Sequence, residues 1–327
     1  MGRIALLFPG QGAQSVGMGR DFAETFPVAR RVFQVAGETL GWDVAARCFE
    51  GPEDELGRTA VSQPCLLTVS AAVLRAMEQE VPDLVKAAEA AAGLSLGEYT
   101  ALVAAGAVGL EDALRLVERR GCLMEEACRR NPGRMASVLG LDADEVREIC
   151  RATPGAIPAN FNCPGQVVVS GDAHALERVA ALARERGAKR VKPLKVAGAF
   201  HSPHMAAARE GLRRELEDVA FEAPRIPVIA NVTAEPVEKP QQIRENLADQ
   251  LTGSVLWQQS MERLIAEGFD TFYEVGPGKV LAGLLKRTGG GVPCVSVNSV
   301  AALETLRSAG RPARRAGAGA REDKGGH

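Results

Sequence analysis

The sequence lacks three features that mark special classes of protein: an excess of one charge, a long apolar run and closely paired cysteines. Its 39 basic and 41 acidic side chains leave a net charge of -2, which provides no electrostatic footprint for nucleic acid or an anionic membrane. No continuous apolar run approaches the roughly 18 residues that a membrane-spanning helix needs, and the apolar segment 4–8 is too short for a signal peptide. We therefore expect a cytoplasmic protein that binds neither nucleic acid nor a membrane.

Cysteine and histidine offer little for a disulfide or metal framework. The seven cysteines are odd in number and never spaced as C-x-x-C, which favours buried free thiols. His201 and His204 have the H-x-x-H spacing, but no nearby cysteine or carboxylate completes a set of zinc ligands. We expect no metal site.

The chain does contain ample material for a folded core, because 46% of its 327 residues are hydrophobic and 24% are charged. The apolar run from residue 3 to Phe8, stopped by Pro9 and Gly10, is typical of a buried parallel strand. Apolar residues spaced by three and four predict helices over 21–40, 62–80 and 98–105. The alternation of strands with helices indicates an α/β core.

A second pattern interrupts this core and has the βαββαβ order of ferredoxin-like domains. Its strands are expected at 135–140, 156–161, 166–170 and 190–196, and its helices at 142–152 and 173–187. Asp142 and Asp172 stand where helix N-caps are expected, and Gly187 where a C-cap is. Core-type elements then resume, with helices over 203–219 and 260–267 and strands over 227–232 and 271–275.

The predicted organisation is therefore discontinuous. One large subdomain comprises residues 1–132 and 198–307, and the small subdomain, residues 133–197, is inserted into it. Residues 308–327 are nearly all Gly, Ala, Arg, Pro and acidic side chains. We expect this tail to be disordered, because it cannot bury enough apolar surface to offset its ordering entropy.

The sharpest local motif is Gly93-Leu94-Ser95-Leu96-Gly97, which fits G-x-S-x-G, the strand-to-helix elbow that exposes a strained nucleophilic serine. Glycines flank the serine because the turn is too tight for side chains. The motif alone is moderately specific, since such patterns recur by chance in chains rich in Gly and Ala. The alanine-rich run 87–92 before it favours a helix by propensity, which conflicts with an elbow.

A nucleophilic serine needs a general base, most often histidine, and the chain has four. His327 lies in the predicted tail and His174 in the first turn of a surface helix. Of the remaining two, His201 is better placed than His204, because it follows the apolar stretch 196–200 where the chain returns from insert to core. A capping or surface role remains the alternative for both.

The loop Gly10-Gln11-Gly12-Ala13-Gln14 follows the first strand and can direct backbone N–H groups at an anion. It lacks the lysine of a G-x-x-x-x-G-K-[ST] phosphate loop and the glycine spacing of a dinucleotide fold. An oxyanion hole that faces the Ser95 elbow is the simpler interpretation.

Together these residues resemble the malonyl-CoA:acyl carrier protein transacylases and the related acyltransferase domains of fatty acid and polyketide synthases. The resemblance is carried by FPGQGAQ (8–14), GLSLGEY (93–99), Arg120-Gly121 with Met124, NFNCPGQ (160–166), GAFHS (198–202) and EVGPGKVL (274–281). Their order and spacing agree from residue 4 to about residue 306. The resemblance implies an α/β-hydrolase-like core with a parallel sheet, plus the inserted ferredoxin-like subdomain.

The resemblance also implies roles for single residues. Ser95 matches the nucleophile, and His201 the base that takes its proton and later returns it. Gln11 and Leu96 match the residues whose backbone N–H groups form the oxyanion hole. In the family a backbone carbonyl rather than an aspartate orients the imidazole, and Gln250 stands at the matching position.

Arg120 matches the residue that grips the free carboxylate of malonate, since the planar guanidinium makes two parallel hydrogen bonds to a carboxylate. Without the family match, an ordinary surface arginine beside Arg119 would be the simpler interpretation. Phe200 resembles the family version associated with malonyl rather than methylmalonyl groups, because a ring beside the second carbon of the substrate would crowd an added methyl. Asn162 and Gln166 are further candidates for substrate binding.

Two positions depart from the family pattern. Leu94 stands where many relatives have histidine before the nucleophile, which puts in doubt any role given to that histidine. Gly253-Ser254 stands where serine or asparagine followed by proline is frequent, and we expect only a loop difference there.

The predicted activity is transfer of malonyl from malonyl-CoA to the phosphopantetheine thiol of acyl carrier protein, through a malonyl-serine intermediate, in fatty acid or polyketide biosynthesis. Both thiol compounds are substrates, no metal or redox cofactor is implied, and a monomer is expected. An acyl hydrolase or proofreading thioesterase with the same Ser-His pair is the main alternative, against which Arg120 argues. A non-catalytic carrier-binding subunit is a second alternative, disfavoured because nucleophile, base and clamp are all present.

Overall fold

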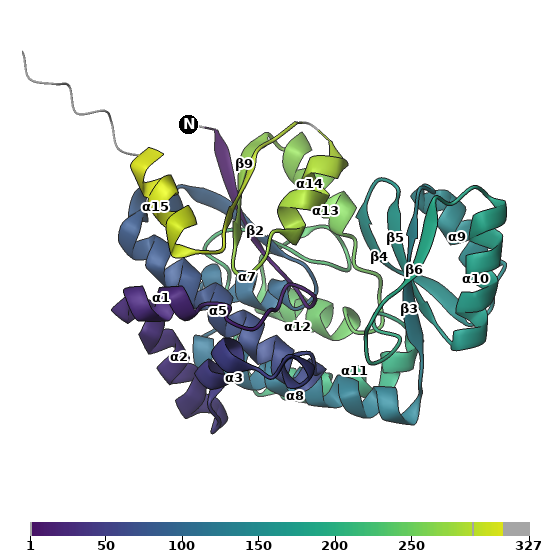
Figure 1. The fold of residues 1–327 in the computed structure, drawn as a ribbon, viewed down its shortest axis with the longest axis horizontal. Helices are drawn as coiled ribbons and strands as arrows, with labels where there is room; N and C mark the ends of the chain where they lie inside the picture. Colours follow the sequence, from purple (N-terminus) through teal and green to yellow (C-terminus); the bar gives the residue numbers. More distant parts are fainter. Residues whose placement is uncertain (1, 290, 310–327) are drawn as a thin grey trace, which may run out of the picture.

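The computed structural model describes residues 2–289 and 291–309. A large α/β subdomain and a smaller four-stranded one lie side by side (Figure 1). Residues 310–327, most of the predicted tail, lie outside the described residues. Ser308 and Ala309 belong to the last helix, α15 (Val300–Ala309), so this helix continues past the predicted start of the tail.

The large subdomain is built on a six-stranded sheet in the order β10-β9-β1-β2-β7-β8. Every neighbouring pair in it is parallel except β7 with β8. The strands are β1 (Arg3–Phe8), β2 (Ala88–Gly93), β7 (Val228–Ile229), β8 (Pro236–Val237), β9 (Phe269–Val275) and β10 (Cys294–Val297). The predicted α/β core with a parallel sheet is confirmed.

Helices pack on both faces of this sheet (Figure 1). They are α1 (Arg20–Thr25), α2 (Pro27–Leu40), α3 (Val44–Glu50), α4 (Glu53–Leu56), α5 (Thr59–Glu80), α6 (Pro82–Lys86), α7 (Gly97–Ala104), α8 (Leu110–Arg130), α11 (Ala206–Glu217), α12 (Pro240–Asp249), α13 (Trp257–Ala266), α14 (Val280–Thr288) and α15. Because side chains alternate along a strand, Ile4, Leu6 and Phe8 of β1 join the core that contains α5, α7 and α8. Ala5 and Leu7 point the other way, into a smaller core with α13 and α14.

The alanine-rich segment before Ser95 is a strand, β2, and not the helix that its propensity favours. It forms parallel ladders with β1 on one side and with β7 on the other, and all its residues except Glu89 are buried. Pairing on both sides satisfies its backbone groups, and its small side chains leave room for the helices on each face. Tertiary context therefore outweighs the helix propensity of alanine.

The small subdomain has the predicted βαββαβ order. Its elements are β3 (Arg134–Leu139), α9 (Ala143–Arg151), β4 (Ala156–Cys163), β5 (Gln166–Gly171), α10 (Ala173–Glu185) and β6 (Arg190–Pro193). The strands form an antiparallel sheet in the order β4-β5-β3-β6. Asp142 and Asp172 cap the two helices through their side chains, and Gly187 has the positive φ of 87° expected after a helix end. We propose subdomain boundaries at 132/133 and 197/198, in the segments that precede β3 and follow β6.

Several predicted elements were too long. The helix expected over 21–40 is two helices, α1 and α2, because Pro27 begins a new helix after the extended Phe26. The helix expected over 203–219 starts as a 3₁₀ turn, Pro203–Met205, before α11. Of the strand expected over 227–232, only the two residues of β7 pair in the sheet.

Helix α5 is long and apolar enough to cross a membrane, with a mean hydropathy of 1.3 over its most apolar window. The sequence did not reveal it as a continuous apolar run, because Ser, Thr and Gln interrupt it. In the fold 83% of that window is buried inside the protein. The composition of α5 is therefore that of a core helix covered by α2, α7 and α8.

Candidate active site

Ser95 lies in a sharp turn between the end of β2 and the start of α7. Its φ of 51° is in the left-handed region that a residue with a side chain rarely adopts. The turn is closely packed: a Cβ on Gly93 would lie 1.9 Å from the carbonyl carbon of Gly97, and a Cβ on Gly97 would lie 2.1 Å from the carbonyl oxygen of Phe8. Glycine is therefore required on both sides of the serine.

We expect the substitution Gly97→Ala to lower the free energy of unfolding by about 1–3 kcal/mol, because backbone atoms must shift to admit the new methyl group. Unfolding in urea measures the change. The matched control is Gly283→Ala in α14, where a new Cβ meets no atom within 4 Å. At that exposed helical position alanine should stabilise by ~0.4–1 kcal/mol. A Gly97→Ala protein as stable as the wild type would show that the elbow is loosely packed.

His201 meets Ser95 across 106 residues of sequence. The Ser95 Oγ and the His201 Nε2 are 2.9 Å apart, and the His201 Nδ1 is 2.7 Å from the backbone carbonyl oxygen of Gln250. Because a carbonyl oxygen can only accept, the Nδ1 carries the proton and donates it to Gln250. The Nε2 lone pair is left to accept the hydroxyl hydrogen of Ser95, and no carboxylate among the described residues is hydrogen-bonded to the ring.

The imidazole is neutral over most of the pH range. Burial, together with the positive charge of Arg120, lowers the pKa of His201 to about 4, and the hydrogen bond to the Gln250 carbonyl opposes this shift only in part. His201 can therefore accept a proton from Ser95 at neutral pH without first losing one.

The glycine-rich loop after β1 packs against the elbow. A Cβ on Gly10 would lie 2.2 Å from the carbonyl oxygen of Leu94, and the Leu94 N–H donates to the carbonyl of Phe8. This contact places the loop that contains Gln11 directly beside the elbow. Among the described residues, no hydrogen bond is made by the backbone N–H of Gln11 or of Leu96. Both donors are therefore available to a developing oxyanion.

The Arg120 side chain extends from α8 to the Ser95 hydroxyl and is 1% exposed. Its Nη1 donates to the Gln63 Oε1 at 2.7 Å, and its Nη2 donates to the Gln250 Oε1 at 2.8 Å and to the Ser95 Oγ at 3.2 Å. The guanidinium also lies over the ring of Tyr99, 5.4 Å from its centroid. A buried cation held by neutral amide oxygens beside a serine hydroxyl is suited to an acyl group that carries its own carboxylate.

Comparison with known proteins shows the family of this chain. Residues 5–317 match the family described as the acyl transferase domain. The chain belongs to the acyl transferase family. Malonyl CoA-acyl carrier protein transacylase of Bacillus subtilis is 43% identical over 310 residues, which are 93% of this chain and 96% of that protein. The protein of the same name from Escherichia coli K12 is 42% identical over 306 residues, or 93% and 98% of the two chains.

Solved structures of similar proteins share the whole fold. A malonyl-transacylase in complex with a type II PKS acyl-carrier protein superimposes with a TM-score of 0.90 at 39% identity, over 94% of this chain and 99% of that one. The acyl-carrier-protein-S-malonyltransferase of Bartonella henselae does so with a TM-score of 0.90 at 40% identity, over 94% and 99%. The acyltransferase therefore has the fold of these enzymes along nearly all of its length.

The other predicted substrate-binding residues, Phe200, Asn162 and Gln166, make no hydrogen bond to Ser95 among the described residues. Phe200 is buried directly before His201. Asn162, near the end of β4, is buried with an Oδ1 that has no partner among the described residues. Gln166, at the start of β5, accepts a hydrogen bond from Arg287 of α14 at 2.5 Å. No hydrogen bond between described residues joins Asn162 or Gln166 to the Ser95 cluster.

Three residues of the site were missed as functional candidates. Asn231, in the loop after β7, accepts from the Ser95 N–H at 2.6 Å and donates to the Gly93 carbonyl at 2.7 Å. Gln63 of α5 and Glu98 of α7 complete the polar surroundings of Arg120. Glu98 was visible within the GLSLGEY motif, whereas no local pattern marks Asn231 or Gln63.

The other histidines lie elsewhere. His174 is exposed beside Glu177, and His204 contacts the Ser202 hydroxyl at 3.4 Å. Within residues 2–289 and 291–309, no group of three or more His, Cys, Asp or Glu side chains is arranged to hold a metal ion.

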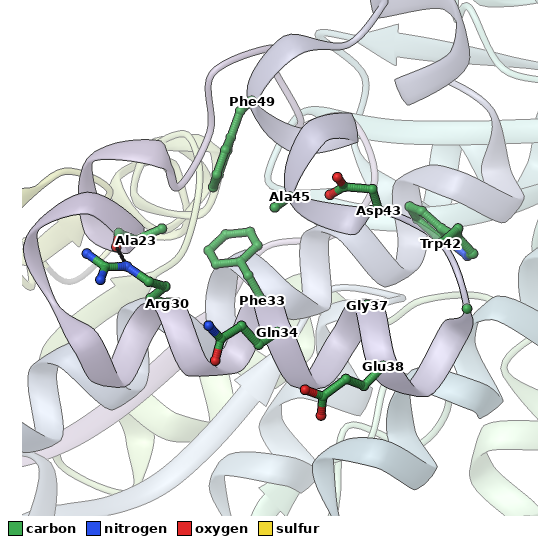
Figure 2. A pocket seen from close by; sticks show the side chains of 11 residues that line it. Ala23, Arg30, Phe33, Gln34, Gly37, Glu38, Trp42, Asp43, Ala45 and Phe49 are labelled. Carbon is green, nitrogen blue, oxygen red and sulfur yellow. Dashed lines mark hydrogen bonds between the residues drawn. The ribbon is translucent and has the colours of Figure 1, made fainter.

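A surface hollow of about 690 Å³ has neither Ser95 nor His201 in its lining. It lies between α2 and α3 and is lined by Phe33, Trp42 and Phe49 with charged residues at its rim (Figure 2). A smaller hollow of about 400 Å³ is lined by Thr59, whose hydroxyl accepts from the Gln11 side-chain amide at 3.4 Å, and by Ala197 of the segment that leads to His201.

Proposed function

We propose that this acyltransferase moves a malonyl group from malonyl-CoA to the phosphopantetheine thiol of acyl carrier protein, through a malonyl ester of Ser95. The observation that carries the proposal is the buried guanidinium of Arg120, whose Nη2 is 3.2 Å from the Ser95 Oγ. The names of the similar proteins, malonyl CoA-acyl carrier protein transacylases, support it. The enzyme would thereby supply the malonyl groups that fatty acid or polyketide synthesis uses.

The reaction proceeds in two halves that use the same groups. The His201 Nε2 takes the proton of the Ser95 hydroxyl as the Oγ attacks the thioester carbonyl, and the oxyanion is held by the N–H groups of Gln11 and Leu96. The C–S bond then breaks, and the imidazolium returns the proton to the departing CoA sulfur. In the second half the carrier thiol gives its proton to His201 and attacks the malonyl-serine ester, and Ser95 recovers the proton as it leaves.

Selectivity comes from the charge of Arg120. The free carboxylate of a malonyl group would replace neutral amide or hydroxyl oxygens as its partner and neutralise the buried cation. An acetyl group would leave that cation without an anion in direct contact. Phe200, buried beside His201, would crowd a methyl group on the second carbon of the acyl chain.

A panel of acyl-CoA thioesters, with carrier protein present and absent, tests the proposed function. We expect kcat/KM for malonyl transfer to exceed that for acetyl transfer by on the order of 10²-fold or more, because an unpaired buried charge is costly. Mass spectrometry of the carrier protein measures the product. Release of free malonate faster than transfer to the carrier would contradict the proposal and indicate an acyl hydrolase.

A further inference from the structure

Glu98 is a buried carboxylate next to the site that the two-step reaction does not use. It lies in the first turn of α7, three residues after Ser95, and is 2% exposed. A single oxygen, Oε2, accepts both of its hydrogen bonds, from the Asn231 N–H at 3.0 Å and from the Gln250 Nε2 at 2.7 Å. Both donors belong to residues that hold the reacting groups.

Gln250 connects Glu98 to three parts of the site. Its Nε2 also donates to the backbone carbonyl of Ser95 at 3.0 Å, its Oε1 accepts from the Arg120 guanidinium at 2.8 Å, and its backbone carbonyl accepts from His201. Every polar atom of this side chain is therefore engaged. The Gln250 amide is therefore one of the two amide groups, with that of Gln63, that hold the guanidinium.

An amide can present either its oxygen or its NH₂ group to a neighbour, but an ionised carboxylate can only accept. Glu98 therefore holds the NH₂ group of Gln250 and turns the Oε1 toward Arg120. If the amide were reversed, its NH₂ group would face a guanidinium that can only donate, and its oxygen would face a carboxylate. The hydrogen bonds of Gln250 to Arg120 and to Glu98 would both be lost. An unpaired polar group is costly when it is buried, as these are.

We propose that Glu98 is a positioning residue, which fixes the Gln250 amide and thereby holds Arg120 beside Ser95 for an acyl group that bears a carboxylate. The proposal rests on the proposed malonyl transfer. It adds Glu98, which acts on Arg120 through Gln250. The charged and titratable groups around Glu98 are Arg120 from α8, Tyr99 on its own helix and His201 beyond Gln250. The segments after α12 and β7 contribute the Gln250 side-chain amide and the Asn231 backbone N–H, and the carboxylate of Asp249 at the end of α12 pairs with Arg209 instead.

Ionisation of Glu98 gives the proposal a measurable pH dependence. Burial raises the pKa of Glu98 to about 7, although the hydrogen bonds from Asn231 and Gln250 and the charge of Arg120 lower it. Above this pH the group is an acceptor only and orients the amide. Below it the group gains an O–H that can donate, so Glu98 no longer favours one orientation, and only the Ser95 carbonyl and the Arg120 guanidinium still do. Malonyl loading should therefore rise with pH through about 7.

The test is Glu98→Gln, which keeps the shape and an acceptor oxygen but removes the charge and adds an NH₂ donor. We expect kcat/KM for malonyl loading to fall about tenfold at alkaline pH, the effect of losing one buried hydrogen bond to a charged group. The wild type should fall toward the level of the variant as the pH drops from about 8 to 6, whereas the variant should stay flat through this range. Its malonyl-to-acetyl ratio should be lowered as well.

Glu274→Gln is the matched control. Glu274, in β9, is also fully buried, and it accepts from the N–H groups of Leu281 and Ala282 and from the Ser296 hydroxyl. It has no link to Gln250, so its variant should keep the wild-type pH profile and acyl selectivity. A second variant, Gln250→Met, keeps the backbone carbonyl for His201 but removes the amide, and should reproduce the flat profile and lowered ratio even if Glu98→Gln does not fold.

A Glu98→Gln enzyme that keeps the wild-type pH profile and the wild-type malonyl-to-acetyl ratio would overturn the proposal. Equal losses of malonyl and acetyl loading at every pH would do so too, because they indicate a purely structural role. A malonyl adduct on Ser95 of the wild type is expected under either result, so the failure of this inference can be told apart from the failure of the proposed function.

Discussion

Replacing Ser95 by alanine is expected to abolish the malonyl adduct that brief exposure to malonyl-CoA produces on the wild type. The hydroxyl supplies both the attacking oxygen and the proton that His201 accepts at 2.9 Å, so no covalent intermediate can form without it. Transfer to the carrier protein should fall by on the order of 10⁴-fold or more, as when the nucleophile of a similar pair is removed. Intact-mass analysis measures the adduct.

The histidines provide the matched control for this experiment. His201→Ala should slow adduct formation strongly, because the base is lost while the hydroxyl remains. His204→Ala should load at the wild-type rate, since the His204 ring contacts the Ser202 hydroxyl and makes no hydrogen bond to Ser95. A Ser95→Ala protein that still gains the mass of a malonyl group would show that another residue is the nucleophile.

Replacing Arg120 by alanine should lower kcat/KM for malonyl transfer by on the order of 10²–10³-fold while sparing or raising acetyl transfer. The malonyl carboxylate would enter a buried pocket without a cation, whereas an acetyl group loses nothing and no longer leaves the guanidinium unpaired. Competition between malonyl-CoA and acetyl-CoA in one reaction, followed by mass analysis of the carrier protein, measures the ratio directly.

Arg119→Ala is the control, because Arg119 is the preceding residue of α8 but is exposed and paired with Glu215. Its variant should keep the wild-type selectivity. Thermal unfolding of Arg120→Ala should be recorded as well, since the substitution leaves the Gln63 and Gln250 oxygens without their donor. A malonyl-to-acetyl ratio unchanged in Arg120→Ala would rule out a carboxylate clamp at this position.

Residues with a local chemical signature could be predicted as parts of the site. The glycines of the elbow point to Ser95, and the small number of histidines points to His201; the structure places these two side chains within hydrogen-bond distance. Arg120 could be named only through the family resemblance, because nothing within α8 distinguishes it from Arg119. Its burial depends on contacts with side chains from α5, α7 and the end of α12.

The residues that were missed show why the site could not be predicted in full from the sequence. Asn231 lies 136 positions from Ser95, and Gln63 lies 57 positions from Arg120, so the contacts depend on how separate elements pack. Asparagine and glutamine side chains are common in sequences and have no local pattern that predicts such a contact. Glu98 was part of a motif, but its link to Gln250, 152 residues away, could not be inferred from the motif.

By itself the sequence determined the features that depend on neighbours within a few residues: the caps at Asp142 and Asp172, the order of the βαββαβ insert and the glycine elbow around Ser95. Only the tertiary structure decided that the alanine-rich segment Ala88–Gly93 is a strand, because ladders to β1 and β7 satisfy its backbone on both sides. Only the tertiary structure likewise decided that Arg120 is buried beside Ser95. The physical reason is the same in both cases, since pairing and burial join segments far apart in the chain, and their free energy exceeds the local preferences that a sequence displays.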